Sequence, residues 1–108
     1  MCQPLDVLHQ SPAGYLMHCA QCRHFHVGFG NLGLTITEQE LHSLMEEMGQ
    51  QLQQWADRVP PGEKRFAFHT DSRRVIMRFC YRDMQQCHEV IAQGMLQWQA
   101  RRLMQDQI

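Results

Sequence analysis

The sequence predicts a single α+β domain, in which two strand–strand–helix (ββα) units form one antiparallel sheet with both helices packed on one face. Three observations lead to this prediction. Apolar residues alternate with polar ones in short segments, as in half-buried strands. They recur every three or four residues in two longer segments, as in helices. The second half of the chain repeats this order without a gap, so that Phe25 and Trp55 match Phe68 and Trp98.

The first unit is predicted over about residues 23–59. Its first strand has an apolar face that consists of Phe25, Val27 and Phe29. Gly30 and Asn31 follow, and both tolerate the positive φ that a two-residue hairpin turn requires. A second strand over residues 32–36 then returns alongside the first, which makes a hairpin.

A helix is predicted to begin after Thr37. A threonine side chain at this position accepts a hydrogen bond from the helix backbone, and Glu40 completes a capping box. The apolar residues that follow keep helical spacing and form one stripe: Leu41, Leu44, Met45, Met48, Leu52 and Trp55. Pro60, Pro61 and Gly62 end the helix and form a linker.

The second unit is predicted over about residues 65–104. In its strands, the side chains that are expected to face inward are Phe66, Phe68, Val75, Met77 and Phe79. A second long helix runs to about Met104, and the repeat places Trp55 and Trp98 at related positions near the C-terminal ends of the two helices. One extra strand, over residues 14–19, precedes both units and carries the first cysteine of a Cys-x-x-Cys pair.

Size and charge narrow the class of protein. A chain of 108 residues is long enough for one self-sufficient core, so a single domain over residues 1–108 is expected. The net charge of −1 argues against a general nucleic-acid coat.

No apolar run reaches the ~18 residues of a membrane span, and no secretory leader is recognisable, so a cytoplasmic protein is expected. Because no nucleophile elbow, phosphate loop or paired-carboxylate pattern occurs, the sequence does not predict an enzyme.

Two of the five cysteines are explained by the repeat. Cys80 matches Thr37 and is therefore expected to cap the second helix. Cys87 matches Leu44 on the apolar stripe, which predicts a small buried side chain. An odd number of cysteines argues against a disulfide framework.

Cys19 and Cys22 have the spacing that lets two thiolates reach one tetrahedral metal ion. Redox proteins use the same spacing at the start of a helix, but this pair is followed by a predicted strand, which favours a zinc knuckle. Such knuckles often carry a glycine next, where this sequence has Arg23. Cys2 and His24 are the candidates for the remaining ligands, although His26 and His69 are alternatives to His24.

The face of the predicted sheet away from the helices is a candidate binding surface. The residues that are expected to form it are His26, His69, Arg65, Arg74 and Arg78. A solvated face is one interpretation, and a site for an anion, a peptide or a second copy of the chain is another. Single-stranded nucleic acid is disfavoured, because the aromatic residues that would stack on bases share a face with the core.

The chain resembles a small bacterial family of uncharacterised proteins of about this length. The resemblance rests on the initial Met-Cys, on "GYLMHCAQC" followed by "HFHVGFGN" with its Phe-Gly-Asn turn, on "LTITEQEL" and on "RVIMRFCYRDMQQC". It implies a shared plan without a known reaction, and it transfers Cys2, Cys19 and Cys22 as a metal or thiol site. The family usually has a serine or a similar cap where this sequence has Cys80.

Together these features predict a non-enzymatic module for protein interaction or self-association, with zinc at the Cys-x-x-Cys knuckle. The alternative is a thiol-redox or metal-handling protein that uses Cys19 and Cys22.

Overall fold

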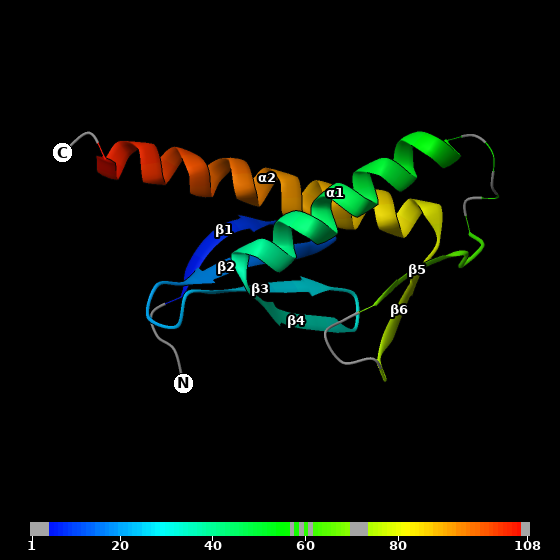
Figure 1. The fold of residues 1–108 in the computed structure, drawn as a ribbon, viewed down its shortest axis with the longest axis horizontal. Coiled ribbons are helices and arrows are strands. Elements are labelled where there is room, and N and C mark those ends of the chain that lie inside the picture. Colours follow the sequence, from blue (N-terminus) through cyan, green and yellow to red (C-terminus); the bar gives the residue numbers. More distant parts are fainter. Residues whose placement is uncertain (1–4, 57, 59, 61, 70–73, 107–108) are drawn as a thin grey trace.

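The computed structural model describes residues 5–56, 58, 60, 62–69 and 74–106. These residues form six strands and two helices (Figure 1). In chain order they are β1 (Asp6–Gln10), β2 (Gly14–Cys19), β3 (His24–Phe29), β4 (Leu32–Ile36), α1 (Glu38–Trp55), β5 (Phe66–His69), β6 (Ile76–Phe79) and α2 (Tyr81–Asp106). The predicted α+β class is therefore confirmed.

The strands form two sheets, so the prediction of one antiparallel sheet is wrong. Strands β1 to β4 make a four-stranded antiparallel sheet in chain order, whereas β5 and β6 pair only with each other among the described residues. The reason is the path of α1, which crosses the first sheet and delivers the chain beyond the β3–β4 turn (Figure 1). The β5–β6 hairpin consequently lies beyond the β3–β4 turn, past the start of β4, instead of beside β4. The tandem repeat stays a prediction.

Both helices lie on the same face of the four-stranded sheet (Figure 1). Helix α2 packs over β1 and β2, and α1 packs over β3 and against α2. Strand β1 was not predicted, because its pairing with β2 slips between Val7 and His9 and only Leu8 of the strand is buried. Such a bulge removes the alternation by which a strand is recognised in a sequence.

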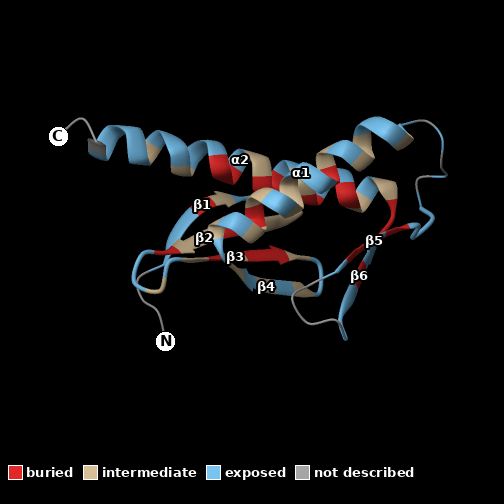
Figure 2. Ribbon diagram, in the orientation of Figure 1, coloured by how far each residue is buried: buried red, intermediate tan, exposed pale blue. Residues whose placement is uncertain are grey.

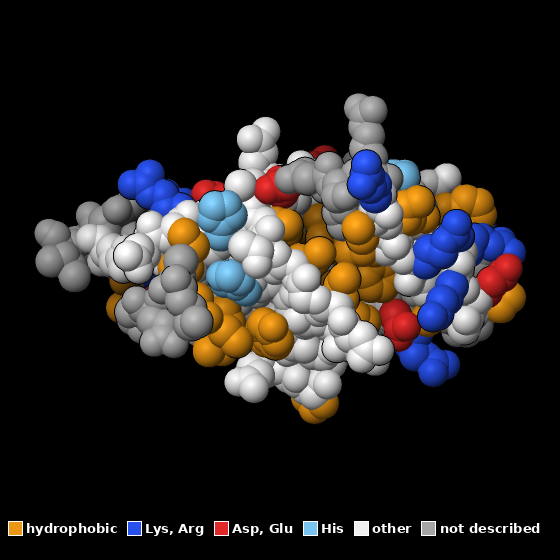
Figure 3. All heavy atoms as spheres, turned by 90° about the horizontal axis from the view of Figure 1, so that it is seen from below, with side chains coloured by type: hydrophobic (Ala, Val, Ile, Leu, Met, Phe, Trp, Pro, Cys, Tyr) orange, Lys and Arg blue, Asp and Glu red, His pale blue; other side chains and the backbone are white. Residues whose placement is uncertain are grey.

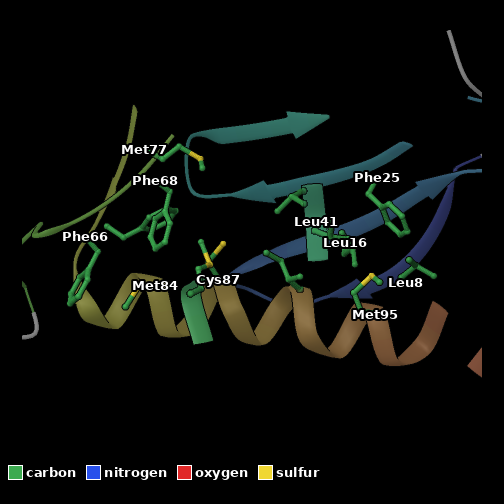
Figure 4. Packing of buried hydrophobic residues seen from close by; sticks show 14 residues of the cluster. Leu8, Leu16, Phe25, Leu41, Phe66, Phe68, Met77, Met84, Cys87 and Met95 are labelled. Carbon is green, nitrogen blue, oxygen red and sulfur yellow. The ribbon is translucent and has the colours of Figure 1, made fainter. Parts of the chain in front are cut away.

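The core fills the space between the helices and the two sheets (Figure 2 and Figure 4). Phe25 is fully buried, and its ring meets the ring of Trp98 edge-on at 5.1 Å between centroids. The aromatic pair of the β5–β6 hairpin, Phe68 and Phe79, lies at 5.8 Å. Val75 was predicted to point inward, but it precedes β6 and is 48% exposed.

The two tryptophans do not occupy equivalent positions along their helices. Trp55 is the last residue of α1, but α2 continues past Trp98 to Asp106. The prediction that both lie near C-terminal helix ends therefore holds for Trp55 alone. The extra length of α2 follows from its position, since this helix runs along β1 and β2 and also reaches β6.

The helix starts follow the predicted chemistry. The Glu40 N–H donates to Thr37 Oγ1 at 3.2 Å, and the Thr37 N–H donates to Glu40 Oε1 at 2.9 Å, so the capping box is confirmed. At α2 the Asp83 N–H donates to Cys80 Sγ at 3.4 Å, which confirms Cys80 as the cap. The Tyr81 hydroxyl donates to the Leu52 carbonyl at 3.1 Å and thereby satisfies a group at the end of α1.

A better cap at position 80 is expected to stabilise the protein. Sulfur is a weak acceptor, whereas a serine hydroxyl accepts the same N–H bond more strongly. We expect Cys80→Ser to raise the free energy of unfolding by about 0.5–1 kcal/mol, measured by urea denaturation. Cys80→Ala, which has no acceptor, should lower it. Equal stabilities of the serine and alanine variants would show that the sulfur does not act as a cap.

Candidate metal centre

The Cys-x-x-Cys pair lies in a tight turn between two strands, as predicted. Strand β2 ends at Cys19 and β3 begins at His24. The Arg23 N–H donates to the Cys19 carbonyl at 2.8 Å, which closes the turn. The Cys22 N–H lies 3.5 Å from Cys19 Sγ and donates to it. The turn thus directs one backbone donor at the sulfur of Cys19.

Arg23 takes the backbone conformation that a glycine takes in many such turns. Its φ is 59°, in the left-handed region. A residue with a Cβ is disfavoured there by about 1–2 kcal/mol, so the surrounding hydrogen bonds must hold it. Arg23 thus takes a conformation that favours glycine, at a cost to the stability of the turn.

The His24 ring is held in one tautomer beside the turn. Its Nδ1 lies 2.6 Å from the Cys22 carbonyl oxygen. Because a carbonyl can only accept, Nδ1 must carry the proton, and Nε2 keeps its lone pair for a metal. A carbonyl that orients a histidine in this way is a common outer-shell partner in zinc sites. His24 pairs with Cys19 across the two strands, so both side chains face the open side of the sheet.

Residues 5–106, apart from the gaps given above, contain no group of three or more histidine, cysteine, aspartate or glutamate side chains placed to hold a metal. Cys19 is fully buried and Cys22 is half-buried. Cys2 lies outside the described residues. The pairing of Asp6 with His18 brings the start of β1 next to the end of β2.

Cys87 takes no part in this site. It is 2% exposed in the core, and burial raises the pKa of its thiol to about 12. The side chain is thus protonated at neutral pH and packs as a small apolar group, as predicted.

The predicted binding face is divided between the two sheets. His26 lies on the four-stranded sheet, where its Nδ1 is 3.1 Å from Thr35 Oγ1 and its enclosed Nε2 has no partner among the described residues. His69 and Arg78 lie on the β5–β6 hairpin, flanked by Arg65 and Arg74, and all four are exposed. Figure 3 shows most of the Lys and Arg side chains toward one end of this side of the molecule.

The sequence did not single out His18, which faces the helices. Its ring lies 4.7 Å from that of Phe25 and 5.7 Å from that of Trp98, between centroids. Burial lowers the pKa of His18 below its ordinary value of 6.5, against the opposing charges of Asp6 and Glu38. The sequence indicates this orientation through position, because His18 comes two residues after the inward-facing Leu16 in the same strand.

Acidification is expected to destabilise the fold through His18. Because its pKa is lowered in the folded state, the unfolded chain binds the proton more tightly. The stability that neutral His18 contributes is complete above pH 6.5 and is lost as the pH falls through the pKa of His18 in the folded state. We expect the free energy of unfolding to decline below pH 6.5, and His18→Phe to make that decline shallower. His69→Gln, at an exposed position, is the matched control, and equal slopes for both variants would contradict the assignment.

No helix among the described residues is long and apolar enough to cross a membrane. The fold and the turn define a small α+β protein with a Cys-x-x-Cys strand turn as its candidate site. The chain belongs to DUF6686, a family of unknown function, whose model matches residues 1–99. The predicted resemblance to a family of uncharacterised proteins is thereby confirmed. No curated protein and no solved structure matches the chain significantly.

Proposed function

We propose that this chain is a non-enzymatic interaction module whose Cys19–Cys22 turn binds a zinc ion. The observation that carries the zinc proposal is the turn itself, with the Cys22 N–H directed at Cys19 Sγ. In this proposal the ligands are Cys19, Cys22, Cys2 and His24 through Nε2. Three thiolates and one imidazole form a common structural zinc set.

The surroundings of the turn favour zinc over thiol redox chemistry. A helix N-terminus lowers the pKa of a redox-active thiol, but the turn joins two strands and no helix begins at it. A zinc ion here would link the end of β2 to the start of β3, in addition to the pairing of the two strands. The role of the metal would thus be structural, with the free energy of binding added to that of folding.

The uncovered side of the four-stranded sheet supports the interaction role. Both helices lie on its other face (Figure 1). The uncovered side carries Val7, Tyr15, Met17 and His26, and Val7 is 44% exposed. Tyr15 and Met17 are half-buried, so together with Val7 they present apolar surface to solvent, as protein contact surfaces do.

Metal content and thiol accessibility test the zinc proposal together. We expect the purified, untagged chain to contain close to one zinc per molecule by elemental analysis. In the native state, addition of a chelator should expose the thiols of the turn to a thiol reagent, as located by mass spectrometry. Protein without zinc, whose turn thiols react equally before and after the chelator, would refute the proposal.

Thiol redox chemistry is the second candidate, because Cys19 and Cys22 are close in one turn and only Cys22 is accessible to solvent. This function predicts a metal-free protein that forms a Cys19–Cys22 disulfide in a glutathione buffer of physiological potential. Disulfide formation only under strongly oxidising conditions would argue against it.

A further inference from the structure

The two edges of the four-stranded sheet differ in how well they are protected. Strand β1 forms one edge, and its pairing is interrupted by the bulge between Val7 and His9. Arg101 of α2 also donates to the Val7 carbonyl at 3.3 Å. Bulges and covering side chains are devices that stop an edge strand from pairing with another chain.

Strand β4 forms the other edge, where the described residues provide neither device. It pairs with β3 over five residues without a bulge, and its sequence, LGLTI, contains no charge and no proline. The two-residue Gly30–Asn31 turn makes Phe29 and Leu32 a hydrogen-bonded pair, and the bonding then alternates along the hairpin. The backbone N–H and C=O groups of Gly33 and Thr35 consequently point away from β3, to an edge that pairs with no other described strand.

The inward side chains of β4 are also incompletely covered. The apolar side chains of β4 pack against the core but are only half-buried: Leu32, Leu34 and Ile36. By contrast, Phe25 and Val27 on β3, which pair with Ile36 and Leu34, are buried (Figure 2). A cleft of about 470 Å³ lies beside Leu34 and Ile36. Its wall continues through α1 to Met77 of the β5–β6 hairpin. A strand placed along this edge would therefore find both backbone partners and apolar surface.

We propose that β4 pairs with β4 of a second copy of this chain, antiparallel, about a two-fold axis at Leu34. This inference deepens the interaction role proposed above, on which it rests, by naming the partner and the surface. The reason for choosing a second copy is that the edge is complementary to itself. In this register Gly33 bonds with Thr35 of the partner subunit, so the four outward backbone groups on each strand have matching partners.

The side chains fit the same register. Leu34 faces its own copy, and Leu32 faces the partner's Ile36, so every apolar residue meets an apolar residue. Thr35 lies opposite the partner's Gly33, and the space where a Cβ of Gly33 would lie is open. A shift by two residues in either direction would draw the turn residue Asn31 or the helix cap Thr37 into the pairing. The resulting dimer would have one continuous sheet with the helices of both copies on the same face.

Charge predicts how this association responds to salt. Two carboxylates, Glu40 and Glu47, line the cleft, and none of its described lining residues is a lysine or an arginine. The two-fold axis brings the acidic rims of both copies toward each other, and salt screens this repulsion. Association should therefore strengthen as salt is raised, whereas nucleic-acid binding would weaken.

Sedimentation of the full chain and a directed cross-link test the proposal. We expect a reversible dimer that Leu34→Glu and Leu34→Lys each dissociate and that an equimolar mixture of the two variants restores. Leu34→Cys should form an intersubunit disulfide under mild oxidation, because facing non-hydrogen-bonded residues have Cα atoms about 4.5 Å apart. Thr35→Cys is the matched control, since it faces Gly33 of the partner subunit and should cross-link no more than the unaltered chain.

A monomer at every concentration would overturn the proposal, and so would a dimer that persists in Leu34→Glu while Leu34→Cys gives no cross-link. In that case self-pairing would be excluded, and binding of a different extended peptide to the cleft would identify another partner. If the charged variants do not fold, the cross-link still decides. Zinc content is measured on the same samples, so that a zinc-loaded monomer refutes the dimer alone and a zinc-free dimer refutes the metal site alone.

Discussion

Cys22→Ser is expected to weaken zinc binding by at least about 100-fold, because even the loss of an outer-shell partner commonly costs about 10–100-fold and this change removes a ligand. Serine keeps the backbone N–H that Cys22 donates to Cys19 Sγ, so the turn itself should persist. The side chain of Cys22 is only half-buried, and its replacement leaves the core intact. The measurement is competition for zinc against a chromophoric chelator.

Cys80→Ser is the matched control for this change, since it also replaces one thiol by a hydroxyl. It lies at the start of α2, where its sulfur accepts the Asp83 N–H, and should leave zinc affinity unchanged. Circular dichroism of both variants would show that the fold is retained. Zinc binding by Cys22→Ser as tight as that of the control would exclude Cys22 as a ligand.

Phe25→Ala should produce the largest loss of stability, about 3–5 kcal/mol in the free energy of unfolding. The ring is fully buried and touches the rings of both His18 and Trp98, so its removal leaves a cavity between the sheet and α2. The thermal midpoint should fall by at least about 10 °C. Urea denaturation followed by Trp fluorescence is the direct measurement.

Val7→Ala provides the comparison for Phe25→Ala. Val7 lies on the opposite side of the same sheet and is 44% exposed, so its truncation should change stability by no more than about 0.5 kcal/mol. If Phe25→Ala lowers the free energy of unfolding by less than about 1 kcal/mol, the packing of α2 on the sheet does not depend on the contact between Phe25 and Trp98.

Local features of the fold were predictable because their signals lie within a few residues. The Thr37–Glu40 capping box, the Gly30–Asn31 turn and the alternation in β3 each depend on neighbouring side chains. The separate β5–β6 sheet was not predictable in the same way. Whether one hairpin joins another depends on where α1 delivers the chain, and no short pattern encodes that path.

The candidate site was predictable in part. Spacing and the following strand identified the turn of Cys19 and Cys22, and His24 lies across from Cys19 at the start of β3. The sequence could not reveal the tautomer of His24, which depends on one carbonyl in the turn. Nor could it show that β1 begins beside His18, because the bulge in β1 conceals that strand.

The long reach of α2 has a consequence for how the protein is made. Strand β1 contacts α2, and Arg101 bonds to Val7, although these residues are separated by almost the whole sequence. During synthesis on the ribosome, α2 cannot cover Leu8 and Leu16 until residues 81–106 have emerged. Until then, these side chains of β1 and β2 stay exposed. Contacts of such high sequence separation slow folding. We therefore expect the core to close in a single late step after synthesis of α2, with the nascent sheet dependent on chaperones until then.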